Sequence, residues 1–144
     1  MALLVSFPQL SWALHVKAEI SKTTVAPGEE FEINITLTNE TTEEKIWNYS
    51  CKGIEELFSS DNPLVLPAVK DSCSGPSSKI VLNAAETTTK KVHFKVLAKT
   101  QWPEFTSIYV GNDGHANFRI GVVNPDQKMK SYANPLSVTI QEPV

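Results

Sequence analysis

The sequence predicts an all-β protein in which two antiparallel sheets of short strands pack face to face. Three observations predict this fold class. Segments in which apolar and polar residues alternate recur along the chain, clusters of Pro, Gly, Asn and Asp separate them, and no stretch has the spacing of an amphipathic helix. The alternating segments amount to about seven or eight strands. A small barrel is the alternative arrangement of the same strands.

Length and composition limit the classes of protein. A chain of 144 residues has the length of one domain, since domains commonly span about 100–150 residues. Hydrophobic residues make up 41% and charged residues 20%, as in ordinary globular proteins, and the net charge of −3 offers no basic surface for nucleic acid. We therefore expect a folded domain without a nucleic-acid partner.

Residues 1–13, "MALLVSFPQLSWA", are mostly apolar and do not alternate. They end in Ser11-Trp12-Ala13, a small-x-small pattern that signal peptidases cut, although the basic leader of a signal peptide is missing. The run is shorter than the ~20 residues that span a bilayer. The sequence favours a signal peptide here, with an apolar segment packed on the domain as the alternative, and a single domain over residues 14–144.

The first strands follow directly. Residues 14–20, "LHVKAEI", place every second side chain on one apolar face and predict a strand with one solvated side. A Pro-Gly turn at 25–29, "VAPGE", leads into residues 30–39, "EFEINITLTN", which alternate without a break and form the clearest strand. Residues 45–50, "KIWNYS", predict a third strand with Trp47 facing inward.

Periodicity is lost between Cys51 and Gly75, where "NPLVLPAV" carries two prolines that exclude a central strand. We expect a long crossover with edge pieces. Alternation returns in "KIVLNAAE" at 79–86 and "TTTKKVHFKVL" at 87–97. "VAPGE" and "LNAAE" lie about 57 residues apart and each introduces a long strand, which predicts two matching hairpins on facing sheets.

The last third contains three more candidate strands, "TSIYV" at 106–110, "ANFRIGVV" at 116–123 and "PLSVTIQ" at 135–141. Asn and Gly tolerate positive φ, so residues 112–114 predict a tight hairpin between the first two.

Cys51 and Cys73 are the only cysteines. A bond between them would close the irregular stretch and stabilise it by roughly 3 kcal/mol. Redox motifs use C-x-x-C and zinc sites use four ligands with closely spaced pairs, and neither spacing occurs. We expect a structural disulfide, which favours a compartment outside the cytoplasm, with two unpaired thiols as the alternative.

Three Asn-x-Ser/Thr triplets begin at Asn34, Asn39 and Asn48. Each is predicted to lie on an outward face or a turn, so each is a candidate glycosylation site in a eukaryotic secreted protein. The alternative is that a chain rich in Asn, Thr and Ser contains such triplets by chance.

Motifs for catalysis are missing from the sequence. The histidines, His15, His93 and His115, have no metal-ligand spacing, and neither a G-x-S-x-G elbow nor a Gly-rich phosphate loop occurs. We therefore expect no enzyme, no catalytic residue, no metal and no cofactor.

Contact residues are sought among aromatic side chains, because Trp and Tyr are common at binding surfaces. Trp102 precedes a proline on a predicted loop and is the first candidate, followed by Tyr109. If the 51–73 excursion enters a protease cleft, Leu64, Val65 and Leu66 become contact residues as well.

The chain resembles the immunoglobulin-like domains of bacterial secreted and surface proteins. "VAPGEEFEINITLTN" and the ending "ANFRIGVVN…SYANPLSVTIQ" carry the resemblance, which covers about residues 18–141. Within that set the chain looks most like the intracellular proteinase inhibitor type, in which a strand ending in Asn precedes a long excursion and a second turn. That turn typically reads Pro-Gly-Glu, and here it reads Ala84-Ala85-Glu86. The resemblance implies an immunoglobulin-like sandwich.

Three functions are compatible with these features. The first is a secreted, periplasmic or cell-surface module, without a membrane span, that binds a protein or carbohydrate partner. The second is a proteinase inhibitor that presents the 51–73 excursion, whose prolines would lower the entropy cost of insertion. The third is a structural spacer. A cytoplasmic location is the alternative if the cysteines are unpaired.

Overall fold

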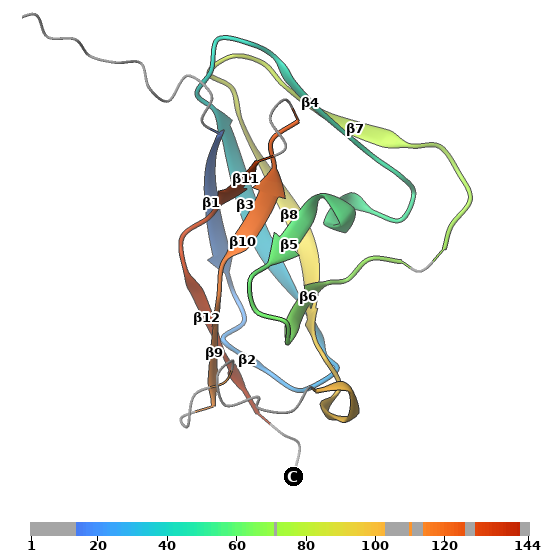
Figure 1. The fold of residues 1–144 in the computed structure, drawn as a ribbon, viewed down its shortest axis with the longest axis vertical. Helices are drawn as coiled ribbons and strands as arrows, with labels where there is room; N and C mark the ends of the chain where they lie inside the picture. The colour runs from blue at the N-terminus through green and yellow to red at the C-terminus, as the bar shows by residue number, and fades with distance from the viewer. Residues whose placement is uncertain (1–13, 71, 103–109, 111–113, 126–128, 142–144) are drawn as a thin grey trace, which may run out of the picture.

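The computed structural model describes residues 14–70, 72–102, 110, 114–125 and 129–141 (Figure 1). The described residues form strands and two short 3-10 helices, and none of them lies in an α-helix. The prediction of an all-β protein is therefore confirmed. Tyr109 and residues 1–13 lie outside the described residues.

The chain contains these elements in order: β1 (Leu14–Ile20), β2 (Thr24–Val25), β3 (Glu30–Asn39), β4 (Lys45–Tyr49), η1 (Ile54–Leu57), β5 (Phe58–Ser60), β6 (Val65–Pro67), β7 (Ser78–Leu82), β8 (Thr87–Val96), η2 (Lys99–Gln101), β9 (His115–Phe118), β10 (Ile120–Val123), β11 (Lys130–Tyr132) and β12 (Leu136–Ile140).

The strands form four small sheets rather than the two predicted. The largest has the order β1-β3-β8-β6, and the others are β11-β10-β5, β2-β12-β9 and the ribbon β4-β7. Every pairing is antiparallel except that of β12 with β2. The described residues form twelve strands rather than the predicted seven or eight, because the 51–75 excursion adds β5 and β6, because β2 and β11 are further short strands, and because "ANFRIGVV" divides into two. The strand predicted at 106–110 and the hairpin predicted at 112–114 lie outside the described residues, apart from Val110 and Gly114.

Arg119 marks that division. Its backbone N–H donates to the carboxylate of Asp61 at 2.7 Å, and its carbonyl accepts a hydrogen bond from the backbone N–H of Asp61 at 3.2 Å. The loop at Asp61 therefore replaces a strand partner at this one residue. As a result β9 pairs with β12, whereas β10 pairs with β5 and β11.

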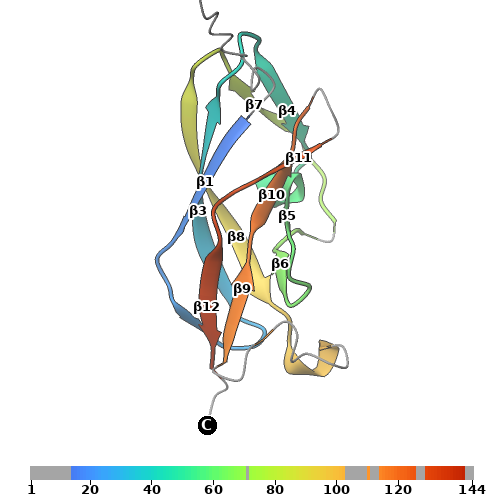
Figure 2. The same cartoon turned by 60° about the vertical axis from the view of Figure 1, so that its left-hand side comes forward.

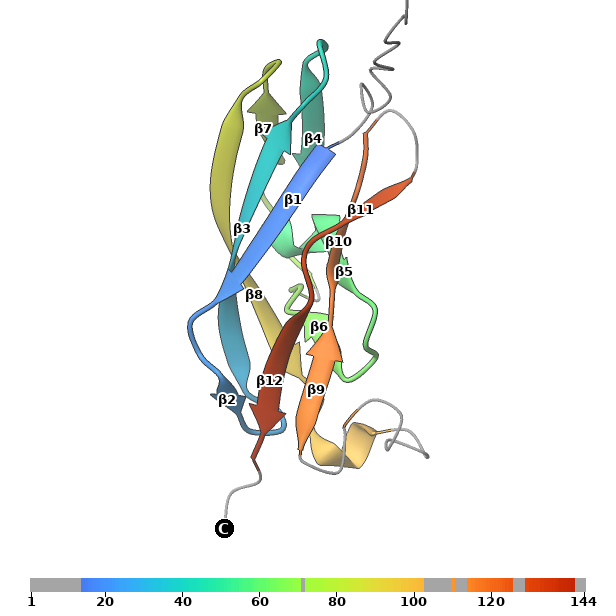
Figure 3. The same ribbon diagram turned by 90° about the vertical axis from the view of Figure 1, so that its left-hand side faces the viewer.

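The core lies between the four-stranded sheet and strands of the smaller sheets. Figures 2 and 3 show β1, β3 and β8 of the four-stranded sheet on one side of the molecule and β5, β9 and β10 on the other. Phe31 of β3 meets Phe118 of β9 between these two sides, with ring centroids 6.3 Å apart and an edge-on angle of 70°. Both rings are buried, and such aromatic pairs stabilise a core beyond the area that they bury.

The predicted alternation appears in the long strands. In β1 and β3 every second side chain is buried, and in β8 the inner residues Val92, Phe94 and Val96 are fully buried. The ribbon β4-β7 turns Trp47, Ile80 and Leu82 inward. The indole N–H of Trp47 donates to the carbonyl of Val123 at 2.7 Å, which ties the ribbon to the end of β10.

The two similar turns lie at opposite ends of one sheet, which differs from the prediction. Rather than introducing hairpins on facing sheets, they introduce β3 and β8, which pair with each other in one sheet. Glu29 closes the first turn by accepting the N–H of Ala26 at 2.9 Å, and Glu86 closes the second by accepting the N–H of Asn83 at 2.8 Å. Each turn thus ends beside the far end of the other strand.

Candidate functional site

The predicted bond between Cys51 and Cys73 is present, with 5.8 Å between the Cα atoms. It closes the excursion that contains η1, β5 and β6. Within the described residues, no three His, Cys, Asp or Glu side chains gather closely enough to hold a metal ion. The disulfide therefore acts as a staple on an excursion whose two strands have three residues each.

The excursion does not present the residues expected to enter a protease cleft. Leu64 and Val65 have no exposed surface and belong to the core, and Leu66 is half-buried. β6 pairs with the edge of β8, where Val65 faces Val96. The expectation that Leu64 and Val65 are contact residues is wrong, because this segment completes the four-stranded sheet. Pro67 is tolerated there because β6 is an edge strand.

Trp102 follows η2 on a loop, as expected, but it is only half-exposed. Its indole N–H donates to the carbonyl of Leu97 at 2.7 Å, and the ammonium of Lys99 lies 5.8 Å from its ring centre. The ring also packs against the core. These contacts give Trp102 a structural role at the end of β8.

The three sequons differ in accessibility. Asn34 and Asn48 are exposed, whereas Asn39 is completely buried, so the prediction that Asn39 faces outward is wrong. Its Nδ2 donates to the carbonyls of Glu43, Leu82 and Asn83, at 2.7, 3.0 and 3.2 Å. Its Oδ1 accepts from the N–H and the hydroxyl of Thr41. Asn39 joins two turns, and its amide nitrogen is unavailable for a glycan.

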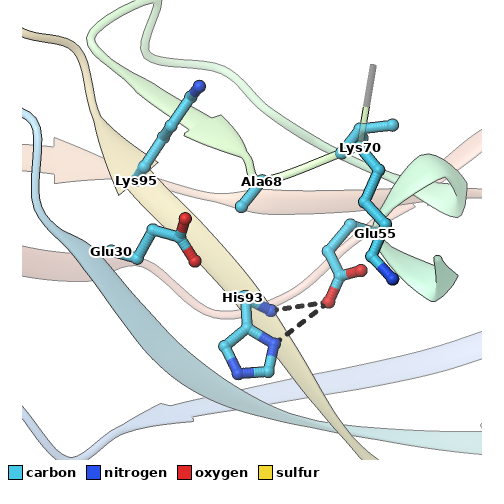
Figure 4. Close-up of a pocket in the computed structure, with 7 residues that line it drawn as sticks. Glu30, Glu55, Ala68, Lys70, His93 and Lys95 are labelled. Atoms are coloured by element: carbon cyan, nitrogen blue, oxygen red, sulfur yellow. Dashed lines mark hydrogen bonds and ion pairs between the residues drawn. The ribbon is translucent and has the colours of Figure 1, made fainter. Parts of the chain in front are cut away.

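A polar pocket of about 410 Å³ lies where η1 meets β8, and Figure 4 shows its residues. Glu55, which is buried, accepts the backbone N–H of His93 at 3.0 Å and lies 3.2 Å from its Nδ1. The other ring nitrogen of His93 is 3.5 Å from Glu32. The backbone bond explains why Glu55 is buried: it occupies the edge of β8 just beyond the last residue of β6.

A second, larger groove of about 610 Å³ lies between β1 and the segment that contains β11. Both are edge strands of their sheets, and Figure 3 shows them near each other. The groove is lined by Leu14, His15, Val16, Lys17, Arg119, Ser131, Tyr132, Ala133 and Asn134. Its volume falls in the range of about 300–1,000 Å³ that is usual for ligand pockets.

Arg119 and Tyr132 form the most prominent feature of this groove. The guanidinium carbon of Arg119 lies 5.5 Å from the centre of the Tyr132 ring, and its Nε donates to the carbonyl of Ala133 at 3.1 Å. The same ring covers Gly121, where an added Cβ would come within 2.9 Å of it. Two contacts therefore fix a Tyr ring that is still 43% exposed.

Asn134 closes one end of the groove. Its Oδ1 accepts the N–H of Ala18 at 2.9 Å, and its Nδ2 donates to the carbonyl of the same residue at 3.1 Å. The side-chain amide thus bonds to β1 as the peptide group of a neighbouring strand would.

Sequence reasoning did not select Arg119, Tyr132 or Asn134. They come from separate segments that meet only because β10 and β11 pair and β12 returns beside β1. The motif "SYANP" before the last strand was visible, but nothing local to it indicated a partner on β1.

No known protein family matches this chain, and no curated protein matches it either. In the part of the chain that the structure describes, no helix has the length and apolar character needed to cross a bilayer.

Proposed function

We propose that this chain is a non-enzymatic, immunoglobulin-like sandwich domain that acts outside the cytoplasm by binding a protein or a glycan. Two facing layers of antiparallel strands support the sandwich assignment. The disulfide between Cys51 and Cys73 supports the location, because such bonds persist in oxidising compartments.

The Arg119–Tyr132 pair carries the proposal of binding. Arg and Tyr are enriched among residues that dominate binding energy, and here they lie together in the larger groove. The ring is held by Arg119 on one side and by Gly121 beneath it, so little side-chain entropy is lost when a partner covers it. An exposed aromatic ring that is already fixed is suited to recognition.

No specific observation favours the other two functions. The inhibitor hypothesis needs an exposed segment in the excursion, and the side chains chosen for that role, Leu64 and Val65, are in the core. The spacer hypothesis predicts no particular surface, so it serves as the alternative against which binding is tested.

The test is a binding screen on arrays of cell-surface proteins and glycans. Arg119→Gln and Tyr132→Ala should each weaken the strongest interaction by about tenfold or more. Lys95→Gln and Ile46→Ala are the matched controls, because they remove a cation and an exposed apolar side chain elsewhere. Binding that both groove variants retain in full, or a screen with no partner, would refute the proposal.

A further inference from the structure

We infer that the groove between β1 and β11 takes an extended, acidic peptide segment of another protein, which adds as a strand to the free edge of β1. This inference rests on the proposed binding function and names the class of partner.

The edge of β1 is the first argument. In an antiparallel pair, the N–H and C=O of one residue point to the same side, and successive residues alternate sides. Ala18 directs both groups to Asn134 and therefore away from β3. Val16, two residues earlier, directs its N–H and C=O to the same side as Ala18.

In the part of the chain that the structure describes, no backbone group pairs with Val16 on that side. The N–H and the C=O of Val16 point away from β3, and neither forms a hydrogen bond with a described residue. Asn134 already pairs with this edge as a peptide group does, and it does so where the groove ends. Ala18 thus already has a peptide-like partner on this edge, whereas Val16 has none among the described residues. An added strand would gain affinity from backbone hydrogen bonds to Val16.

Charge selects the kind of peptide. Lys17, Arg119 and His15 line the groove, and no Asp or Glu belongs to its described lining, although the chain as a whole carries a net charge of −3. Among the described residues, Lys17 forms an ion pair with Glu19 alone, at 3.4 Å on the exposed surface. The Nε of Arg119 donates to the carbonyl of Ala133, and no described carboxylate forms an ion pair with the guanidinium. A carboxylate from a bound peptide would supply that partner.

Strand edges border the groove, and an extended segment can pair with a strand edge. Two edge strands border it, the Tyr132 ring lies at its side, and Asn134 closes one end. A strand advances about 3.3 Å per residue, so side chains on alternate residues can contact Tyr132 and Arg119 while the backbone pairs with Val16.

The experiment uses the folded protein and three fluorescent eight-residue peptides. One alternates Val and Glu, the second alternates Val and Lys, and the third is the Val–Glu peptide with every backbone nitrogen methylated. Anisotropy gives the affinities, and nitrogen–proton spectra follow the amide of Val16. We expect the Val–Glu peptide to bind at least about tenfold more tightly than the Val–Lys peptide, because like charges in a groove repel.

The remaining expectations separate strand addition from simple charge attraction. Methylation of the peptide backbone should abolish binding. On addition of the Val–Glu peptide, the chemical shift of the Val16 amide should change, whereas that of the Ala18 amide, which Asn134 holds, should change little. Arg119→Gln should weaken the affinity for the Val–Glu peptide by about tenfold, whereas Lys95→Gln should leave this affinity unchanged. Equal binding of the Lys peptide, binding that survives methylation, or an unshifted Val16 amide would each overturn the inference.

Two further outcomes distinguish this inference from the proposed function. In one outcome, binding of the partner found on the arrays requires Arg119 and Tyr132 while no peptide changes the chemical shift of the Val16 amide. In that case the inference of strand addition fails and the proposed binding function stands. If the Val16 amide shifts with protein concentration alone, the occupant is a second copy of this chain, and the acidic peptide is ruled out.

Discussion

Gly28 and Ala85 occupy the same position in two copies of one turn. Each is the third of four residues, with φ of 85° and 63°, and each donates its backbone N–H across the sheet, Gly28 to Val96 and Ala85 to Asn39, at 2.8 Å. Positive φ costs a residue with a Cβ free energy that glycine does not lose. The second turn is therefore strained at Ala85.

Replacing Ala85 by glycine is expected to raise the free energy of unfolding by about 0.5–1 kcal/mol, because relief of the strained φ outweighs the added freedom of the unfolded chain. Urea unfolding measures the change. Ala84→Gly is the control: its φ is not positive, so the substitution should lower stability by about 0.5 kcal/mol. An equal loss in both variants would show that Ala85 is unstrained.

Asn39→Ala is expected to lower the free energy of unfolding by about 2–4 kcal/mol, because it leaves the buried carbonyl of Leu82 and the N–H of Thr41 without their partners. Asn48→Ala, at an exposed sequon, should change it by less than about 0.5 kcal/mol. Thermal and urea unfolding of the two variants give the comparison. A small effect at Asn39 would contradict the bonding described for its amide.

Removal of the disulfide by Cys51→Ser together with Cys73→Ser is expected to lower the free energy of unfolding by roughly 3 kcal/mol, because the bond closes a loop with a sequence separation of 22 residues. Equilibrium unfolding of the oxidised protein and the double variant measures the difference. Addition of a reductant should destabilise the wild type toward the variant and leave the variant unchanged. A wild type that is insensitive to reductant would count against the staple.

Glu29 provides a pH-dependent prediction. The hydrogen bond from Lys22, at 2.6 Å, and then that from the N–H of Ala26 hold the pKa of the Glu29 carboxyl below its ordinary value of 4.5. A lowered pKa in the folded state stabilises the fold above pH 4.5, and this contribution is lost as the pH falls through the folded-state pKa.

The stability difference between the wild type and Glu29→Gln should therefore shrink on acidification. A carboxyl titration by NMR checks the cause, since Lys22→Ala should move the pKa of Glu29 back toward its ordinary value. A pKa that does not respond to Lys22→Ala would assign the shift to another group.

The long strands could be predicted because burial on one face imposes a period of two on the sequence. β1, β3 and β8 follow that period, and the Glu at the end of each turn could be recognised from spacing alone. Local pattern could not reveal that β3 and β8 pair with each other. That pairing depends on contacts between segments about 57 residues apart in the sequence, for which a single sequence carries no direct signal.

The errors share one physical origin. Asn39 is a polar residue placed in the interior because backbone groups at turns need partners, and such needs depend on the tertiary fold. The sequence around Leu64 and Val65 predicts an irregular crossover because β6, with three residues, is too short to show alternation. The groove residues Arg119, Tyr132 and Asn134 were missed for the same reason: their contacts are long-range.

In our proposal, β1 has an edge at Val16 that no described residue pairs with, beside the Arg119–Tyr132 pair. Amide hydrogen exchange of the protein alone tests it most directly. We predict that the Ala18 amide, bonded to Asn134, exchanges at least about tenfold more slowly than that of Val16, because opening is required only at Ala18. Equal protection of the two amides would contradict the account, because another segment would then already pair with the edge that the partner is proposed to use.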